Sequence, residues 1–447
     1  MASEPVPAGA EPTIIPRPDH NISRANISRN ALKVMYRLRD GGFQAFLVGG
    51  GVRDLLLGRE PKDFDIATDA TPEQVRKLFR NCRLIGRRFR LAHVYFGREI
   101  VEVATFRGSE LPGETRDDDG GFVKDEEGRL LRDNIYGSID QDIWRRDFTA
   151  NALYYNIADY SIWDYAEGVK DIRRGVLRLI GDPVERYRED PVRLLRAARF
   201  AAKLGFRLDP DTEAPIDDMA PLLASVPPAR LFDETLKLFL SGHAVQSYES
   251  LRHYGLFGYL FPAADELLDS PDGDAFRALL LAGLANTDKR VAEDQPVTAV
   301  FLFCLLLWGP TRQLAADYQA DGEPPVQALL FASDEIGDRQ QEHVAIPRRV
   351  MTPAKEMMLM QLRMQRTRGK RVLGLLGHPR FRAAYDFLLL RAETGDEDPE
   401  LASFWTQLQE MSPEEQAKAV GAGRSSSKGG RKRRRPRRRK PSGSTGH

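Results

Sequence analysis

Residues 46–68 read FLVGGGVRDLLLGREPKDFDIAT. The apolar run Ala45–Val48 has the length of a strand, and three glycines, Gly49 to Gly51, follow it directly. Because glycine lacks a Cβ atom, backbone N–H groups can approach an anion closely, and a helix beginning after the glycines would add the positive end of its dipole. We interpret this turn as part of a nucleotide pocket that receives a triphosphate. A Walker A loop is excluded, because no Gly-Lys-Ser or Gly-Lys-Thr closes the turn.

Two carboxylates, Asp63 and Asp65, lie near the end of the same stretch. At positions i and i+2 of a strand they project from one face, while Phe64 points to the other. Two adjacent anions repel each other unless a cation joins them, and Mg²⁺ takes oxygen ligands together with substrate phosphates. Two such ions can clamp the attacking and leaving oxygens of an in-line displacement. A glycine turn or an Asp-x-Asp pair alone is common in proteins, so it is their combination that carries the interpretation.

A third carboxylate, Glu102, lies in the segment EIVEVATF of residues 99–106, which alternates as a strand does. A carboxylate on an otherwise apolar strand is costly unless it is paired, bound to a metal or directed to water. Glu102 is therefore either a third acidic metal ligand or an outward-facing residue.

The composition predicts a soluble protein of about three domains in its 447 residues, with 42% hydrophobic residues for buried cores. Cys82 and Cys304 are far apart, so neither a disulfide framework nor a zinc site is indicated. Residues 1–18 lack the features of a secretory signal and are expected to form a disordered lead. The longest apolar run, 297–308, is too short for a membrane span and predicts a buried helix. The expected location is cytoplasmic.

The net charge of +1 conceals an asymmetry between the body of the chain and its end. Residues 421–447 contain eleven Lys or Arg and no Asp or Glu, which leaves −10 on residues 1–420. This low-complexity tail cannot form a core and is expected to stay solvated.

Hydrophobic periodicity predicts the secondary structure around the glycine stretch. A helix capped by Ser28 is expected through Arg39, a second helix over 69–79, and a hairpin that turns at Gly97-Arg98. Residues 108–140 are acidic and glycine-rich, so they predict a surface loop that is either a lid or a simple insertion. Beyond Pro210 the chain is predicted to be helical.

Two further segments concentrate charge. Arg145, Arg146 and Asp147 are consecutive, and the segment RYREDPVRLLRAARFAAKLGF starts a helix near Asp190-Pro191. Its arginines, Arg193, Arg196 and Arg199, follow at intervals of three and are expected on one polar stripe beside Asp190. The stripe is either a solvated face or a surface for a phosphate and a purine.

Taken together, these ordered motifs resemble the class II branch of the polymerase-beta nucleotidyltransferase superfamily, which tRNA CCA-adding enzymes and bacterial poly(A) polymerases share. The resemblance covers most of residues 20–240. It implies an α+β fold, with a nucleotidyltransferase head that contains a small mixed sheet, followed by an all-helical neck and body. The expected segments are a lead over 1–19, a head over 20–165, a neck over 166–235, an RNA-binding body over 236–415 and a disordered basic tail over 416–447.

The resemblance also assigns roles to residues. It makes Asp63 and Asp65 the ligands of a two-magnesium site, with Glu102 as a tentative third, and it places Gly49, Gly50 and Arg53 in the phosphate cradle. The Arg-Arg-Asp-Phe-Thr motif maps onto residues 145–149, and the Glu-Asp-x-x-Arg motif maps onto residues 189–193. The remaining nucleotide contacts expected from these motifs and from the arginine stripe are Arg146, Asp190, Arg193 and Arg196, beside a catalytic Asp147 near the ribose.

The segment LIGRRFRLAHV of residues 84–94 resembles the signature that distinguishes bacterial poly(A) polymerases from CCA-adding relatives. The basic tail favours the same branch. Its expected RNA-binding residues are Arg431, Lys432, Arg433, Arg434, Arg435, Arg437, Arg438, Arg439 and Lys440.

The implied activity is template-independent addition of AMP from ATP to RNA 3′ ends, which releases pyrophosphate and promotes RNA turnover. ATP and RNA 3′ ends are the implied partners, and the RNA-degradation machinery or an RNA chaperone are candidate protein partners. A CCA-adding tRNA nucleotidyltransferase is the alternative enzyme, and a catalytically silent RNA-binding adaptor is the alternative of another class.

Overall fold

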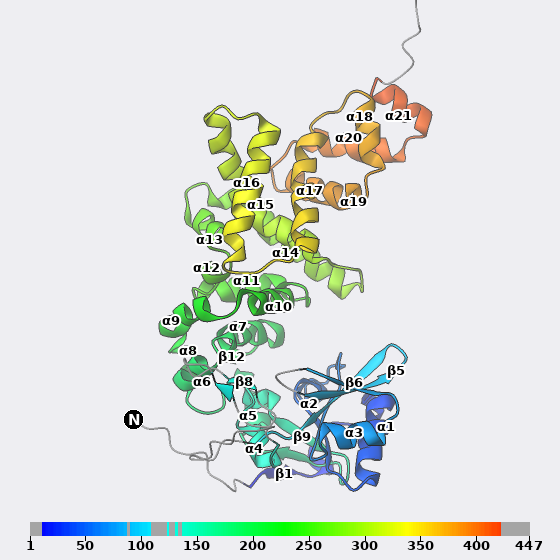
Figure 1. Cartoon of the computed structure of the whole chain (residues 1–447), viewed down its shortest axis with the longest axis vertical. Coiled ribbons are helices and arrows are strands. Elements are labelled where there is room, and N and C mark those ends of the chain that lie inside the picture. Colours follow the sequence, from blue (N-terminus) through cyan, green and yellow to red (C-terminus); the bar gives the residue numbers. More distant parts are fainter. Residues whose placement is uncertain (1–10, 87–89, 109–122, 125–129, 133–135, 422–447) are drawn as a thin grey trace, which may run out of the picture. The chain divides into compact units, whose positions relative to one another are not determined.

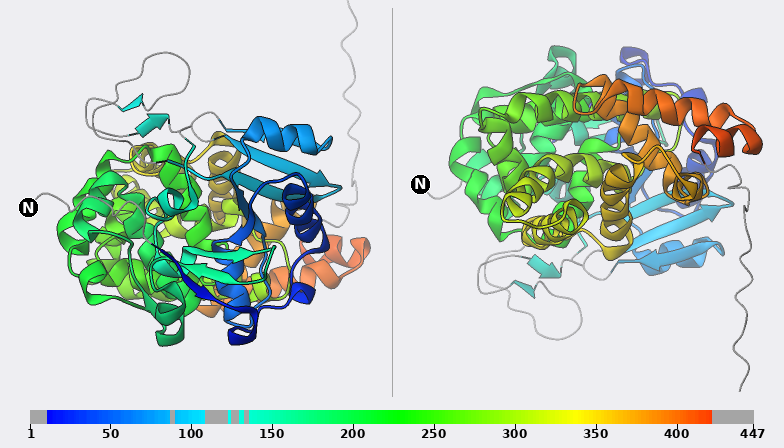
Figure 2. Two further views of the ribbon diagram at one scale, coloured as in Figure 1. Left: turned by 90° about the horizontal axis from the view of Figure 1, so that it is seen from below. Right: turned by 90° about the horizontal axis from the view of Figure 1, so that it is seen from above.

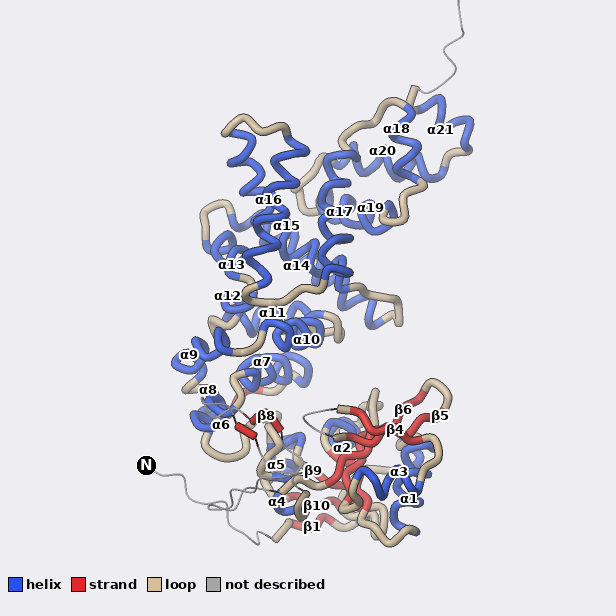
Figure 3. The backbone as a smooth tube through the Cα atoms, in the orientation of Figure 1, coloured by secondary structure: helices blue, strands red, loops and turns tan. Residues whose placement is uncertain are grey.

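A computed structural model describes residues 11–86, 90–108, 123–124, 130–132 and 136–421 of the chain. Two compact units are present, Met1–Lys355 and Glu356–His447. Strands gather in the N-terminal part of the first unit, and helices form the rest of the described chain, so the predicted α+β class is confirmed (Figures 1 and 3). The expected body of residues 236–415 has parts in both units, and the other domain boundaries stay predictions. The expectation of a disordered lead over 1–19 is wrong for its last part, because β1 (Thr13–Ile15) pairs with β10 (Ile162–Asp164) in the main sheet and a 3-10 helix follows at Arg17–Asp19.

The main sheet has eight strands in the order β1-β10-β9-β2-β3-β6-β5-β4. Only β3 and β6 pair in parallel, and every other neighbouring pair is antiparallel. The predicted hairpin about Gly97-Arg98 is confirmed, because β5 pairs with β6 from Ala92↔Val103 to Phe96↔Glu99. The strands in sheet order are β1 Thr13–Ile15, β10 Ile162–Asp164, β9 Leu153–Asn156, β2 Ala45–Val48, β3 Asp65–Thr68, β6 Glu99–Thr105, β5 Leu91–Phe96 and β4 Cys82–Ile85.

Strand β2 is buried on both faces, which explains its unbroken apolar sequence. Helices α1 (Arg29–Asp40) and α3 (Pro72–Leu78) pack beside each other against the strands (Figures 1 and 2). The Ser28 hydroxyl accepts from two N–H groups of α1, as predicted, and Thr71 forms a capping box at α3, which begins at Pro72 and not at residue 69. In an aromatic cluster on the sheet, Phe46 meets Tyr154 edge-on at 5.9 Å between ring centroids.

Around the glycine turn, helix α2 (Gly50–Leu56) begins directly after β2, and β3 begins at Asp65. Asp63 therefore precedes the strand instead of lying on it, which corrects the expectation that both carboxylates occupy one strand. Strand β3 does not extend back to Asp63, because its antiparallel partner β2 has no residue to pair there. Val48, the last residue of β2, pairs with Asp65, and the glycine turn follows.

Helices connect this sheet to the rest of the first unit. The first of them are α4 Ile139–Ile143, η3 Thr149–Asn151, α5 Gly168–Arg174, α6 Pro183–Glu189, α7 Val192–Leu204, α8 Pro210–Glu213, α9 Ile216–Met219 and η4 Ala220–Ser225. The short strands β11 Val176–Leu177 and β12 Arg207–Leu208 pair in parallel. Asp190 ends α6, and Pro191 is the cap of α7, so the predicted start of the arginine helix is displaced by one residue.

The chain beyond Pro210 is helical throughout its described part, as predicted. The helices that complete the first unit are α10 Pro228–Phe239, α11 Ala244–His253, α12 Phe257–Leu260, α13 Pro262–Asp269, α14 Gly273–Ala292, α15 Ala299–Ala320 and α16 Pro325–Gln341. Helix α15 contains the long apolar run and is the one described helix long and apolar enough to cross a membrane, with 61% of its most apolar window buried. It continues through Pro310 to Ala320, past the end of that run, since packing against α13, α14 and α16 outweighs the hydrogen bond that proline cannot donate.

The second unit contains the end of α17 (Arg348–Met364) and α18 Lys370–Leu376, α19 Phe381–Glu393, α20 Pro399–Glu410 and α21 Pro413–Ala419. Trp405 is fully buried in its core, and its indole N–H donates to the Met364 carbonyl at 2.9 Å. Within the expected loop of residues 108–140, the described part includes a short hairpin, β7 (Val123–Lys124) with β8 (Leu130–Arg132), and the start of α4.

Candidate active site

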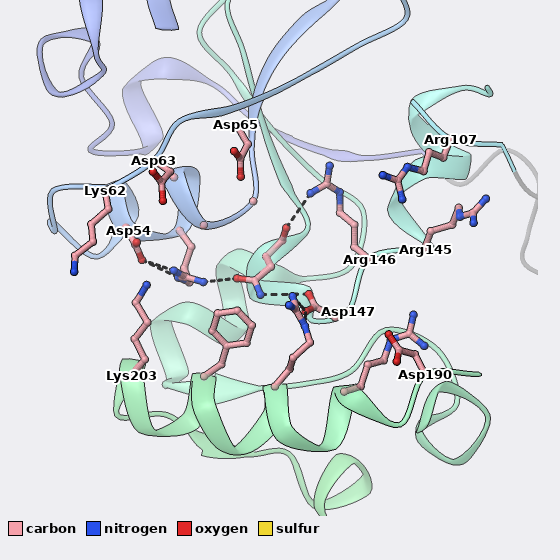
Figure 4. A pocket seen from close by; sticks show the side chains of 18 of the residues that line it. Asp54, Lys62, Asp63, Asp65, Arg107, Arg145, Arg146, Asp147, Asp190 and Lys203 are labelled. Carbon is pink, nitrogen blue, oxygen red and sulfur yellow. Dashed lines mark hydrogen bonds and ion pairs between the residues drawn. The ribbon is translucent and has the colours of Figure 1, made fainter. Parts of the chain in front are cut away.

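A cavity of about 610 Å³ opens between the end of β2, the start of β3 and helix α7. Figure 4 shows Asp63 and Asp65 on one wall and α7 on the opposite wall. Most of the residues predicted for the site line this one cavity, although they come from segments far apart in the chain. They are Gly49, Gly50, Arg53, Asp63, Asp65, Arg146, Asp147, Asp190, Arg193 and Arg196. Glu102 is not among the lining residues, and Arg431 to Lys440 lie outside the described residues.

Two of the three glycines, Gly49 and Gly51, differ in what their positions require. Gly49 has φ +68° and ψ −136°, a backbone conformation that residues with a Cβ atom rarely adopt. At Gly51 a Cβ atom would lie 3.4 Å from the carbonyl oxygen of Asp63, an ordinary van der Waals distance, so the packing of α2 on the loop that carries Asp63 does not require glycine there. Gly49 therefore determines the path of the backbone at the cavity wall.

The acidic pair is electrostatically strained. The pKa of Asp65 is raised to about 6, first because protein surrounds much of the carboxylate and then because Glu102 and Asp63 are negatively charged. Its side chain still contacts the solvent of the cavity, so the group is a recessed carboxylate that a ligand can reach. Neither Asp63 nor Asp65 has a hydrogen bond or ion pair from its carboxylate within the described part of the chain. Two neighbouring carboxylates of this kind favour the binding of a cation beside them.

Glu102 lies on β6 beside the acidic pair. The parallel register aligns Ile66 with Val103, which places Asp65 and Glu102 at adjacent positions of neighbouring strands. The Glu102 carboxylate is 3.3 Å from Nε2 of His93, and its side chain is 40% exposed. Glu102 therefore contributes negative charge at Asp65, while its side chain contacts a neighbouring histidine and solvent.

A continuous chain of charged and amide groups crosses the floor of the cavity. Arg53 is 2% exposed and donates from Nε and Nη2 to Oδ1 of Asp54 at 2.8 and 2.7 Å, and from Nη1 to Oδ1 of Asn151. The Asn151 amide donates to Oδ1 of Asp147 at 3.3 Å, and Oδ2 of Asp147 accepts two hydrogen bonds from Arg196. Arg196 holds the pKa of Asp147 below its usual range although burial alone would raise it. This series of hydrogen bonds and ion pairs connects α2, η3 and α7.

A second network holds the arginines that precede Asp147. Arg146 donates to Tyr154 Oη at 2.7 Å and to Asp142 Oδ2 at 3.0 Å, and Tyr154 donates to the same carboxylate at 2.6 Å. Burial alone would lower the pKa of Arg146, but Tyr154 and Asp142 raise it, so this arginine stays charged. Burial and the neighbouring charge of Arg107 lower the pKa of Arg145 to about 10. This end of the cavity is strongly positive.

Helix α7 presents one face to the cavity, with Arg193, Arg196, Phe200 and Lys203 at helical spacing. Arg199 does not line the cavity, because six steps of 100° from Arg193 place it about 120° around the helix from that residue, outside the sector that holds the other four. It instead lies 3.7 Å from Glu234 on α10, with its guanidinium over the Phe200 ring. The prediction of a single three-arginine stripe is therefore wrong for Arg199.

The Asp190 and Arg193 side chains are both anchored at the other end of this face. Arg193 donates from Nη1 to the Arg186 carbonyl at 2.8 Å and to Glu189 Oε2 at 2.7 Å. Oδ2 of Asp190 accepts from Arg230 of α10 at 2.7 Å. Helix α10 thus contacts this region at two points, because Arg230 holds Asp190 just before α7 and Glu234 lies beside Arg199 on α7.

Six cavity residues escaped the sequence analysis: Asp54, Lys62, Arg107, Asn151, Phe200 and Lys203. Asp54 and Lys62 lie inside the quoted stretch, and Asn151 follows the Arg-Arg-Asp-Phe-Thr motif by two residues. Phe200 and Lys203 could have been found by continuing the helical period from Arg193 and Arg196 to i+7 and i+10. Asn151 has no comparable signal, because its importance depends on two partners from other elements.

Comparison with known proteins agrees with this geometry. Family models described as "Poly A polymerase head domain", "Probable RNA and SrmB- binding site of polymerase A" and "Polymerase A arginine-rich C-terminus" match residues 45–178, 205–268 and 321–440. Poly(A) polymerase I of Salmonella typhi is 50% identical over 419 residues, which cover 93% of this chain and 90% of that protein. The CCA-adding enzyme of Lactobacillus helveticus is 37% identical over 220 residues, which cover 49% and 52%.

Among solved structures, a tRNA-processing enzyme with CTP aligns with a TM-score of 0.59 and 23% identity, covering 87% of this chain and 96% of that one. At this identity the likeness concerns the fold alone. High identity over nearly the whole length distinguishes the two branches of the superfamily, because the CCA-adding relative aligns over only about half of each chain. The chain belongs to the bacterial poly(A) polymerase family.

Proposed function

We propose that this protein adds AMP from ATP to the 3′ ends of RNA without a template and releases pyrophosphate. The observation that carries the proposal is the cavity itself, which is lined both by the Asp63–Asp65 pair and by Asp190 and Arg193 at one end of α7. Membership of the poly(A) polymerase family supports the same reaction.

The carboxylates suit a divalent cation. Asp63 and Asp65 offer hard oxygen ligands that no protein donor occupies within the described residues, and the like charge of Asp63 and Glu102 already raises the pKa of Asp65. The described part of the chain contains no cluster of three such ligands that could enclose an ion without help. This donor set fits Mg²⁺, which is commonly held by one or two carboxylates together with substrate phosphates. Two bound ions would neutralise the phosphates and activate the attacking hydroxyl.

The chain's own residues hold the substrates in the following proposed arrangement. Asp190 and Arg193 contact the adenine, and Asp147 with Arg196 positions the ribose. The turn at Gly49 and Gly50 accepts the triphosphate, with Arg53 and Arg146 supplying positive charge around it. In this arrangement the RNA 3′ oxygen attacks the α-phosphorus, a new P–O bond forms, the bond to the β-phosphate oxygen breaks, and the hydroxyl proton leaves to solvent. The fixed positions of the charged groups lower the cost of organising the transition state.

Replacement of the carboxylates tests this proposal. Asp63→Ala or Asp65→Ala is expected to lower the rate of AMP incorporation at least ~10²-fold, on the scale of one preorganised electrostatic group. Asp40→Ala is a matched control, because Asp40 is a surface aspartate that pairs, among the described residues, with its neighbour Arg39 alone. Near-normal turnover by either cavity variant, with the control unchanged, would refute the assignment.

Nucleotide choice separates the two enzyme branches. The protein is incubated with a tRNA that lacks its 3′ end and with each labelled nucleotide in turn. Long AMP tails support the present proposal, whereas CMP incorporation would establish the CCA-adding alternative. Absence of any Mg²⁺-dependent incorporation would favour the silent RNA-binding adaptor.

The protein partners and the location extend the proposal further. Docking of the RNA-degradation machinery or an RNA chaperone, a role in RNA turnover, RNA binding by the tail and a cytoplasmic location remain predictions from the sequence. Co-purification of the tagged full-length protein with and without ribonuclease tests the protein partners directly, because a contact made only through RNA is lost on digestion.

A further inference from the structure

Two lysines mark the end of the cavity opposite Asp190. Lys203 lies in the last turn of α7, and Lys62 directly precedes the acidic pair; both line the cavity. Figure 4 shows their side chains reaching toward the same space from opposite walls, next to Asp54 and Asp63. Neither lysine belongs to the motifs from which the site was predicted.

The charges around these two lysines favour the binding of an anion. No hydrogen bond or ion pair is present at the ammonium of Lys62 or Lys203 within the described residues. Burial lowers the pKa of Lys203, Asp54 partly offsets this, and the charges of Arg53, Arg199 and Lys62 lower it further. Asp54 already accepts two hydrogen bonds from Arg53, so its charge is shared. Cations crowded in a partly buried space are unfavourable without an anionic partner.

Positive charge also continues beyond the cavity at this end. Arg59 donates to the Lys203 and Leu204 carbonyls at 3.4 and 3.3 Å, which fixes the end of α7. His243, at the start of α11, has a pKa lowered by burial, and the charges of Lys203, Arg59 and Lys62 contribute to this shift, while Asp288 opposes it. Cations from two segments, Arg59 with Lys62 and Lys203 on α7, therefore lie around one place, beside the uncharged His243.

The spacing along α7 matches the length of a nucleotide. Ten residues separate Arg193 from Lys203, which corresponds to about 15 Å along the helix axis. If the base lies at Asp190 and Arg193 and the α-phosphate faces Asp63 and Asp65, the terminal phosphates extend toward Lys203. A lysine ammonium suits this task, because it is a compact point charge that can follow phosphate oxygens through several positions.

We infer that Lys62 and Lys203 bind the β- and γ-phosphates of ATP and the pyrophosphate that leaves. The inference rests on the proposed function and adds the two residues that hold the leaving group. Both lysines contact substrate and product, and neither contacts the base. They are therefore expected to determine affinity for phosphates without affecting the choice of nucleotide.

Inhibition by phosphates tests the inference. Lys203→Met is expected to raise the inhibition constant of pyrophosphate about tenfold, the effect of losing one charge-assisted hydrogen bond. The KM for ATP rises by a similar factor, kcat changes little, and inhibition by AMP and the preference for ATP over CTP stay the same. Lys62→Met gives the same pattern, and Lys203→Arg retains most of the affinity. Lys170→Met is the control, because this exposed lysine pairs with Glu167 outside the cavity.

Two results would overturn the inference. One is an unchanged pyrophosphate constant in the double variant Lys62→Met/Lys203→Met, with its fold verified by circular dichroism. The other is a loss of RNA affinity without a loss of pyrophosphate affinity, which would assign these lysines to the RNA backbone. Calorimetric titration of tripolyphosphate into the full-length protein and the double variant tests the lysines without turnover. Failure of the wild-type protein to incorporate AMP would thus refute the proposed function without deciding this inference.

Discussion

Asn151 joins Arg53 to Asp147 across the floor of the cavity, so Asn151→Ala removes the junction between α2, η3 and α7. The Asn151 side chain accepts from Arg53 through Oδ1 and donates to Asp147 through Nδ2. Only one orientation of the amide satisfies both neighbours, because Arg53 can only donate and the Asp147 carboxylate can only accept. The alanine variant has neither group.

The size of the effect follows from these two contacts. A hydrogen bond to a charged group contributes about 1.5–3 kcal/mol, and Asn151 makes two of them while only 7% exposed. Water from the adjoining cavity can replace part of what is lost, and the interaction with Asp147 is long at 3.3 Å. We therefore expect a local destabilisation of about 2 kcal/mol, below the simple sum of two charged hydrogen bonds.

Native-state hydrogen exchange measures this change where it occurs. A two-unit chain need not unfold in one step, so a single unfolding free energy would mix independent transitions. Amides of α2 and η3 that exchange by local opening are expected to lose about 30-fold in protection, which corresponds to about 2 kcal/mol. Amides of α18 to α21 in the second unit serve as the internal reference and should not change.

The control is Asn26→Ala, which removes an exposed asparagine whose side chain makes no hydrogen bond in the described structure. If Asn151→Ala changed protection of α2 and η3 no more than Asn26→Ala does, the junction would have no energetic role. An equal loss across both units would also refute the reasoning, because it would indicate general destabilisation and not a local connection.

Five further outcomes are expected. Since folding raises the pKa of Asp65 from 3.8 to about 6, its ionisation destabilises the metal-free fold progressively as the pH rises from 3.8 to 6, and the full effect is present above pH 6. Asp65→Asn should therefore raise the melting temperature most at pH 8 in EDTA and less at pH 5. Added Mg²⁺ competes with the proton, so the acid limb of the pH–rate profile near pH 6 should move lower as Mg²⁺ increases. Arg230→Ala releases Asp190 and should weaken discrimination between ATP and CTP, measured as a ratio of kcat/KM, whereas an unchanged ratio would contradict support by α10. Gly49→Ala forces an alanine into φ +68° and should cost about 1 kcal/mol of stability, measured by urea denaturation of the first unit. Deletion of 421–447 should reduce the salt dependence of RNA binding, from a log–log slope of roughly −4 if the tail makes about six phosphate contacts.

Local elements around the glycine stretch were predictable because their signals are short-range. The strand Ala45–Val48, the Ser28 cap and the hairpin at Gly97-Arg98 all depend on residues within a few positions of each other. The start of β3 was not predictable to the residue, since it depends on where β2 gives way to the glycine turn. The continuation of α15 through Pro310 depends on packing against three helices, which outweighs the local effect of proline.

The sequence by itself determined the chemical inventory: an acidic pair after a glycine turn, two arginine motifs and a basic tail. Those motifs suffice to identify the family, because each is a short run of residue types in a set order. Only the tertiary structure decided which of these residues line one cavity. Arg199 does not line it, whereas Asn151, Phe200, Lys62 and Lys203 do. The physical reason is that the lining of a cavity depends on the rotation of each helix and on partners from distant segments. The glycine turn thus supplies one wall of the site, and helix α7 supplies the other.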